Sequence, residues 1–176
     1  MNTQNKNSVR LVVELVALIG LLVGNISLAT STATVAATVT LQNVSVSVAD
    51  GSISYGTLAV NTTKTTLAGG LNDQQVATNA GNVAEDFNIK GQNSANWTLA
   101  GTAGVDTYVH KFCVATCGTE GTPGAGFTAL TTSYASLATN VATSGTQAFD
   151  LLINIPTSSA TFTSQSVDVM VQAVAH

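Results

Sequence analysis

The sequence contains very little charge. Lys and Arg number 5 and Asp and Glu 9, so charged residues make up 8% of the 176 residues, against about 25% in an ordinary globular protein. Thr, Ser, Asn and Gln occupy the polar positions instead. Because so few basic residues are available to neutralise phosphates, we expect no nucleic-acid partner. The low charge also leaves little self-repulsion to keep copies of the chain apart.

Signatures of catalysis are also missing. The sequence contains no Gly-x-Ser-x-Gly, His-Glu-x-x-His, phosphate-loop or dinucleotide-binding motif. It has two histidines, His110 and His176, which offer little material for a triad. A metal site built from His110, Cys113 and Cys117 is one alternative, but it lacks the fourth ligand of a structural zinc site. We therefore predict a protein that is not an enzyme and has no cofactor.

The N-terminal region has the composition of an export signal. Two basic residues precede an apolar run, residues 15–23, and small residues follow it, as in a signal peptide. Glu14 shortens the apolar run below the length that crosses a bilayer core of ~30 Å, so a retained anchor is the weaker alternative. We predict a signal peptide over residues 1–37, cleaved between 29 and 37, and a secreted, extracellular cell-surface protein with no stable membrane span after cleavage.

The rest of the chain alternates between apolar and polar residues. A period of two is typical of half-buried strands. The runs with this period are residues 44–48, 53–55, 74–78, 87–89, 97–99, 107–113, 149–155 and 167–173. Turn signals such as Asp50-Gly51 separate them, and residues 133–141 are the one helical candidate. We predict that residues 38–176 form one all-β domain, a single antiparallel, jelly-roll-like β-sandwich preceded by the signal peptide.

The two cysteines lie four residues apart. In one extended strand the Cα atoms of Cys113 and Cys117 would be about 13 Å apart, beyond the ~7 Å limit of a disulfide, so a bond requires a turn between them. The glycine-rich run at residues 118–126 favours such a turn. Because an exported protein meets oxidising conditions, we predict a Cys113–Cys117 disulfide that pins this loop.

Aromatic residues are few, and the pattern places them in the core. Trp97 is the only tryptophan, and its alternation with Leu99 predicts a core anchor rather than an exposed sugar-binding platform. In residues 107–113 the face that carries Tyr108 and Phe112 is expected inward, because Lys111 on the opposite face is costly to bury.

Two sets of polar residues leave alternatives open. The isolated aspartates that lie beside turn residues are Asp50, Asp73 and Asp106. They are most simply turn formers, with calcium ligation as the alternative. The glycosylation sequons begin at Asn43, Asn61 and Asn96, and they matter only if the host modifies such sites.

Two short motifs and the overall plan resemble known surface proteins. SISYGTL at residues 52–58 and NWTL at residues 96–99 resemble the tyrosine-glycine strand and the Trp-x-Leu element of WxL-type cell-surface domains, which are exported, β-rich and associated with the bacterial wall. The region near the C-terminus, FDLLI at residues 149–153, has no second Trp-x-Leu. The plan of an export signal, one jelly-roll-like domain and low charge resembles TasA/camelysin-type secreted matrix and fibre subunits. These resemblances imply wall binding and assembly, respectively.

A long stretch with strand character, residues 33–48, follows the export signal. The apolar side chains of this predicted assembly strand are Val39, Leu41, Val44, Val46 and Val48. Their parity changes after Leu41, which predicts a bulge near residues 42–43. If the first part does not pair within its own domain, it can complete the sheet of a neighbouring copy. We therefore hypothesise a secreted structural protein that assembles with copies of itself in a fibre, sheath or extracellular matrix. The alternative is a module that binds cell-wall polymer or carbohydrate.

Overall fold

The computed structural model describes residues 30–176. The chain forms two units, one ending at Val39 and one from Thr40 to His176. Most of the predicted signal peptide lies outside the described residues. The described part contains strands and no helix, so the prediction of an all-β fold is confirmed. None of these residues belongs to a helix that could cross a bilayer.

The strands are short, and β11 is the longest of them. Their bounds are β1 Val46–Ala49, β2 Thr63–Thr65, β3 Gln75–Asn79, β4 Glu85–Lys90, β5 Thr98–Leu99, β6 Thr107–Cys113, β7 Gly118–Thr119, β8 Thr122–Pro123, β9 Thr128–Ala129, β10 Ala135–Val141, β11 Thr146–Asn154 and β12 Met170–Ala175.

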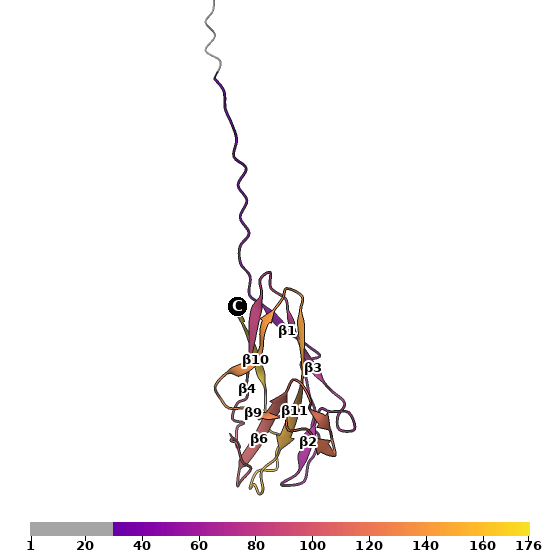
Figure 1. Ribbon diagram of the computed structural model, residues 1–176. Helices are drawn as coiled ribbons and strands as arrows, with labels where there is room; N and C mark the ends of the chain where they lie inside the picture. The colour runs from indigo at the N-terminus through magenta and orange to yellow at the C-terminus, as the bar shows by residue number, and fades with distance from the viewer. Residues whose placement is uncertain (1–29) are drawn as a thin grey trace, which may run out of the picture. The chain divides into compact units, whose positions relative to one another are not determined.

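The strands pair into two principal sheets, which together make the predicted antiparallel β-sandwich. The large sheet has seven strands in the order β1-β3-β11-β6-β5, with β2 also beside β11 and β9 also beside β6. The small sheet has the order β10-β4-β12, and β7 and β8 form a separate hairpin. The pairings are antiparallel except the short one between β5 and β6. Figure 1 shows β11 between β6 and β2 in the lower half of the domain.

The core lies between the inner faces of the two sheets. In β4, Phe87 and Ile89 are fully buried, and they alternate with half-buried polar residues, as the sequence pattern predicts. In β11 every residue from Phe149 to Ile153 is buried, so both faces of this strand are covered; on the face away from the core, Asp150 accepts hydrogen bonds from Thr66 and Gln74. Tyr108 and Phe112 of β6 point into the core as expected, so the face opposite Lys111 was assigned correctly.

Residues 133–141 were expected as a possible helix, and this expectation is wrong. They contain β10, which pairs with β4 through two register shifts, between Ser136 and Ala138 and between Ala138 and Val141. Leu137 of β10 lies in the core, and Ala135, Ala138 and Val141, which are spaced three apart, pack against the core as partly buried residues. This spacing imitates the i, i+3 pattern of a helix although the backbone is bulged and extended.

Residues 53–55 and 167–169 were expected in strands, but neither stretch pairs with another strand. The side chains of Ile53, Tyr55, Val167 and Val169 nevertheless pack against the core. In these two stretches the period of two therefore reflects burial of alternate side chains, although the backbone does not pair with another strand.

Candidate functional site

The N-terminal segment, residues 30–42, exposes large apolar side chains. It contains no charged residue, no glycine and no proline, and none of it belongs to a strand. Val35, Val39 and Leu41 are 89%, 96% and 88% exposed. They share one parity with Ala37, so one face of this segment would be apolar in an extended conformation. Uncharged segments with high β-propensity and no proline readily pair with another strand edge.

The predicted assembly strand is divided between two environments. Val46 and Val48 lie in β1, where they pair with Asn79 and Ala77 of β3 and pack against the core. Val44 is 38% exposed, and Val39 and Leu41 lie in the N-terminal segment. The predicted bulge near residues 42–43 is not found within a strand, because β1 begins only at Val46.

Five hydrogen bonds anchor the chain just before β1, two of them from the Ala80 and Asn82 N–H groups to the carbonyls of Ser45 and Asn43. The side chain of Asn82 donates to the Leu41 carbonyl and accepts from the Asn43 N–H, both at 2.8 Å. The Ser45 N–H donates to Oε1 of Glu85 at 2.8 Å. Glu85 is completely buried, and its role in anchoring the chain was not predicted from the sequence. Glu85 shares the inward face of β4 with Phe87 and Ile89, and this alternation in the sequence could have predicted that its side chain is buried.

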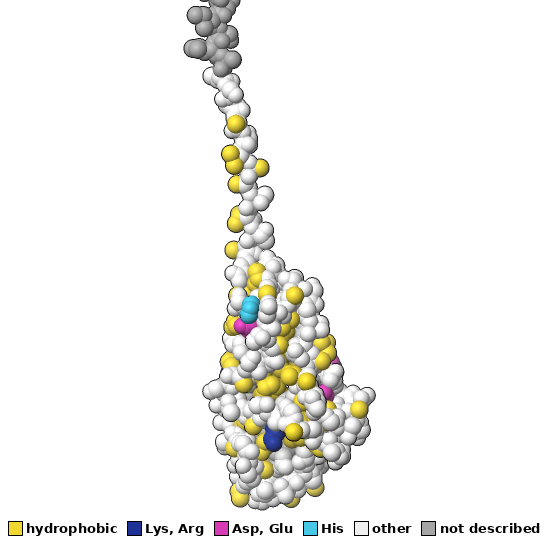
Figure 2. All heavy atoms as spheres, in the orientation of Figure 1, with side chains coloured by type: hydrophobic (Ala, Val, Ile, Leu, Met, Phe, Trp, Pro, Cys, Tyr) yellow, Lys and Arg dark blue, Asp and Glu magenta, His cyan; other side chains and the backbone are white. Residues whose placement is uncertain are grey.

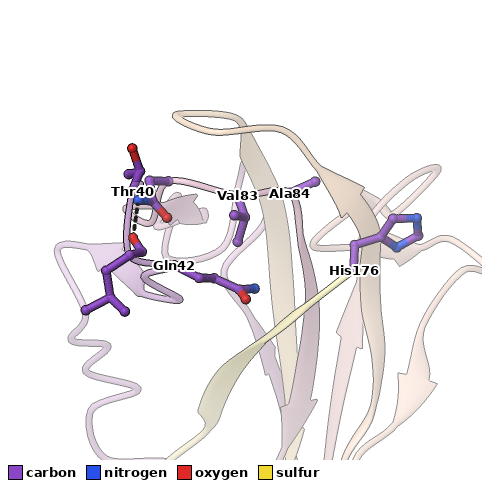
Figure 3. A pocket seen from close by; sticks show the side chains of 7 residues that line it. Thr40, Gln42, Val83, Ala84 and His176 are labelled. Carbon is purple, nitrogen blue, oxygen red and sulfur yellow. Dashed lines mark hydrogen bonds between the residues drawn. The ribbon is translucent and has the colours of Figure 1, made fainter. Parts of the chain in front are cut away.

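A small pocket of about 340 Å³ lies beside this anchor. Figure 3 shows Thr40, Gln42, Val83, Ala84 and His176 around it. Nδ1 of His176 lies 2.8 Å from the carboxylate of Asp86. A hydrogen bond from the Asn140 backbone and the contact with His176 lower the pKa of Asp86. Across residues 30–176, no three His, Cys, Asp or Glu side chains group closely enough to hold a metal ion.

A much larger groove, with a volume of about 1220 Å³ and an apolar floor between largely polar walls, opens into the sandwich. Its floor includes Phe149, Leu151 and Ile153 on the inner face of β11. Its walls come from residues 52–60 and 160–169, which we call the wall segments. Within the described chain, neither wall segment makes a backbone–backbone hydrogen bond, although both contribute apolar side chains to the groove.

One hydrogen bond ties the first wall segment to the large sheet. The Tyr55 hydroxyl lies 3.0 Å from Nε2 of His110, a buried residue of β6. Burial lowers the pKa of His110 to about 4, and the nearby backbone of Val167 opposes this shift only weakly. Among residues 30–176, Nδ1 of His110 has no partner at ordinary hydrogen-bond geometry. Burial, followed by the charge of Asp73, raises the pKa of Tyr55, so this hydroxyl stays protonated.

Trp97 lies at the edge of the groove. It packs on the core beside Tyr108, with 6.3 Å between the ring centroids, and its indole N–H donates to the Ser159 hydroxyl at 3.1 Å. The ring is half-buried. It is thus an anchor for the loop that carries the second wall segment, in keeping with the core position expected from its alternation with Leu99.

The predicted disulfide between Cys113 and Cys117 is confirmed, with the Cα atoms 5.7 Å apart. Thr116 and Gly118 adopt positive φ angles of 59° and 80°, which supply the required turn. Because both sulfurs are bonded to each other, the alternative of a metal site with His110 is ruled out.

The hairpin that follows the disulfide reaches back to β2. Glu120 accepts hydrogen bonds from Thr65 and lies 3.2 Å from Nζ of Lys64. Burial alone would raise the pKa of Glu120, but the contacts with Thr65 and Lys64 lower it. The β7-β8 hairpin is therefore fixed by one covalent bond and one charged cluster.

The fold and the disulfide place the chain among all-β sandwich proteins. Comparison with protein-family models, with curated proteins and with solved structures finds no match to it.

Proposed function

We propose that the protein is a secreted, non-catalytic structural protein of the cell surface that assembles with copies of itself by strand addition. One observation carries the proposal. The N-terminal segment exposes Val35, Val39 and Leu41 in an uncharged run that directly precedes an anchored strand. Addition of this run to a neighbouring copy gives a fibre, sheath or matrix in which each copy holds the next.

The physical chemistry of the segment favours this use. Burying three side chains of the size of Val or Leu stabilises a complex by about 1.5–3 kcal/mol each before the cost of ordering the chain. Extended backbone can add hydrogen bonds along its whole length, and alternate side chains set its register. Charged residues are sparse on the face of the protein in Figure 2, so close approach of copies meets little repulsion.

The export signal and the disulfide support a location outside the cell. Disulfides persist in oxidising compartments, and the sulfurs of Cys113 and Cys117 are bonded to each other. The basic residues and the apolar run before residue 29 support export independently of the disulfide. Assembly by the N-terminal segment requires the earliest of the predicted cleavage sites, after Ala29, because that site leaves the whole segment, with Val35, in the mature protein.

Removal of the apolar face of the segment tests the proposal. We expect Val35→Ser/Val39→Ser/Leu41→Ser to abolish the filaments or large oligomers that the unaltered protein forms, measured by light scattering after size exclusion and by negative-stain microscopy. The matched control is Thr34→Ser/Thr38→Ser/Thr40→Ser, which changes the opposite face and should retain assembly.

The same preparations distinguish assembly from the alternative function, which is binding to cell-wall polymer or carbohydrate. A strictly monomeric unaltered protein at high concentration contradicts assembly. If that monomer is retained by isolated cell-wall polymer, the protein acts instead as a cell-wall or carbohydrate-binding module.

A further inference from the structure

We propose that this groove over β11 is the acceptor site, and that its occupant is residues 33–41 of a second copy of this chain. This inference rests on the proposed function, because it names the surface on which strand addition takes place. The inserted segment lies between the two wall segments and over the inner face of β11.

The sandwich has room for a strand at this position. The large sheet is five strands wide, in the order β1-β3-β11-β6-β5, and the small sheet three, so part of the inner face of the large sheet extends beyond the small one. β12 is an edge strand of the small sheet and is paired with β4 on one side. Val169, just before β12, and Val171, within it, line the groove. A strand in the groove would therefore continue the small sheet beyond β12.

Much of the backbone of the groove walls is available for pairing, although the Ala59 and Thr163 carbonyls and the Thr161 N–H bond to side chains. In the described residues, the two wall segments form no backbone–backbone hydrogen bonds, yet Ile53, Leu58, Val167 and Val169 pack against the core. Unpaired N–H and C=O groups beside an apolar floor are the features that a β-strand from another chain uses for affinity.

The N-terminal segment suits the groove in its pattern and in its lack of charge. Residues 33–41 span about 30 Å when extended, whereas the wall segment 52–60 is not extended throughout, since Gly56 has a φ of 72°. In residues 33–41 the larger apolar side chains share one parity, so one face can rest on Phe149, Leu151 and Ile153 while threonines face outward. The segment carries no charge, so it brings no ion of its own into the groove, whose lining includes the acidic residue Asp168.

The direction of the chain favours a second copy over the segment's own groove. The backbone groups of Leu41, Asn43 and Ser45 bond at every second residue to Asn82, Ala80 and Glu85, so this stretch is extended and leads directly into β1. To return to its own groove the chain must reverse before Leu41. Residues 36–41 contain no Gly, Pro, Asn or Asp to make that reversal.

Cysteine trapping tests the site in the whole protein. One variant carries Thr38→Cys, and partner variants carry Ser54→Cys or Ser166→Cys, one on each wall segment. The control partner carries Thr139→Cys on β10, at the opposite edge of the small sheet. Each mixture is oxidised mildly and scored for disulfide-linked dimers on non-reducing gels, with mass spectrometry of the linked peptides. Because each chain has one added cysteine, a mixed dimer reports contact between two copies.

We expect Thr38→Cys to form at least tenfold more mixed dimer with Ser54→Cys or Ser166→Cys than with the control, Thr139→Cys. If filaments form but Thr38→Cys links preferentially to Thr139→Cys, the groove is overturned while assembly by strand addition stands. If no mixture forms oligomers, the proposed function fails as well. If Thr38→Cys and Ser166→Cys in a single chain yield a linked monomer, the segment fills its own groove, which also overturns the inference.

The processed N-terminus provides a second test. Cleavage after Ala29 leaves all of residues 33–41, whereas cleavage after Ala37 leaves only Val39 and Leu41 from the apolar face. We expect the intact mass of the exported protein to place its N-terminus before Ala33. A mature chain that starts at Thr38 overturns the inference, because so short a segment cannot fill the groove.

Discussion

At the scale of single residues, His110 makes the stability of the domain depend on pH. Its pKa in the folded protein is about 4 because of burial, against an ordinary value of about 6.5. Between these values the unfolded chain binds a proton and the folded chain does not. The contribution of His110 to stability is therefore complete above pH ~6.5 and is lost as the pH falls toward 4. The facing titratable groups, Tyr55 and Tyr108, remain protonated throughout this range.

We expect the free energy of unfolding to fall by up to about 3 kcal/mol between pH 6.5 and pH 4, measured by urea denaturation at each pH. His110→Gln should remove most of this slope, because it leaves no group to protonate beside Tyr55. His176→Gln is the matched control, since His176 is exposed and paired with Asp86, and it should keep the slope. An unchanged slope in His110→Gln would contradict this assignment.

At the scale of elements, the disulfide stabilises the β7-β8 hairpin. It joins residues separated by four positions, and closure of so short a loop stabilises the folded state by about 2 kcal/mol on the chain-entropy estimate. We expect Cys113→Ala/Cys117→Ser to lose about this much in urea denaturation. A reducing agent should lower the free energy of unfolding of the unaltered protein by a similar amount and leave that of the variant unchanged. Equal stability with and without reduction would show that the bond merely accompanies a hairpin already held by Glu120.

The sequence predicted those elements in which burial and pairing coincide. β4, β6 and β11 were found because Phe87, Tyr108 and Leu151 belong to regular alternations that are also hydrogen-bonded strands. Ile53 and Val167 have the same alternation without a neighbouring strand, and periodicity cannot report whether a partner exists. The helix expected over residues 133–141 failed because two bulges changed the spacing of its buried side chains.

The candidate site was predictable in part for the same reason. The donor residues Val39 and Leu41 are visible in the sequence as alternation that continues past the expected export signal. The groove is not visible in it, since its floor and walls come from residues far apart in the chain. The cysteines were predictable because their pairing depends on a turn of three residues and not on tertiary structure.

At the scale of the whole molecule, the scarcity of charge determines which forces hold an assembly together. The chain has a formal net charge of −4, and residues 33–41 carry none. Strand insertion then depends on apolar burial and backbone hydrogen bonds, which salt affects little, whereas contacts between exposed charges are screened within ~10 Å at 0.1 M salt.

We expect the extent of assembly, measured by light scattering, to change less than twofold between ~0.02 and ~0.5 M NaCl. The screening length falls several-fold over this range. Thr34→Glu/Thr38→Glu adds charge to the outward face of the segment, so it should assemble poorly at low salt and recover at high salt. A steep loss of assembly by the unaltered protein in salt would mean that charged contacts hold the copies together, and the groove would then lose its role as the principal interface.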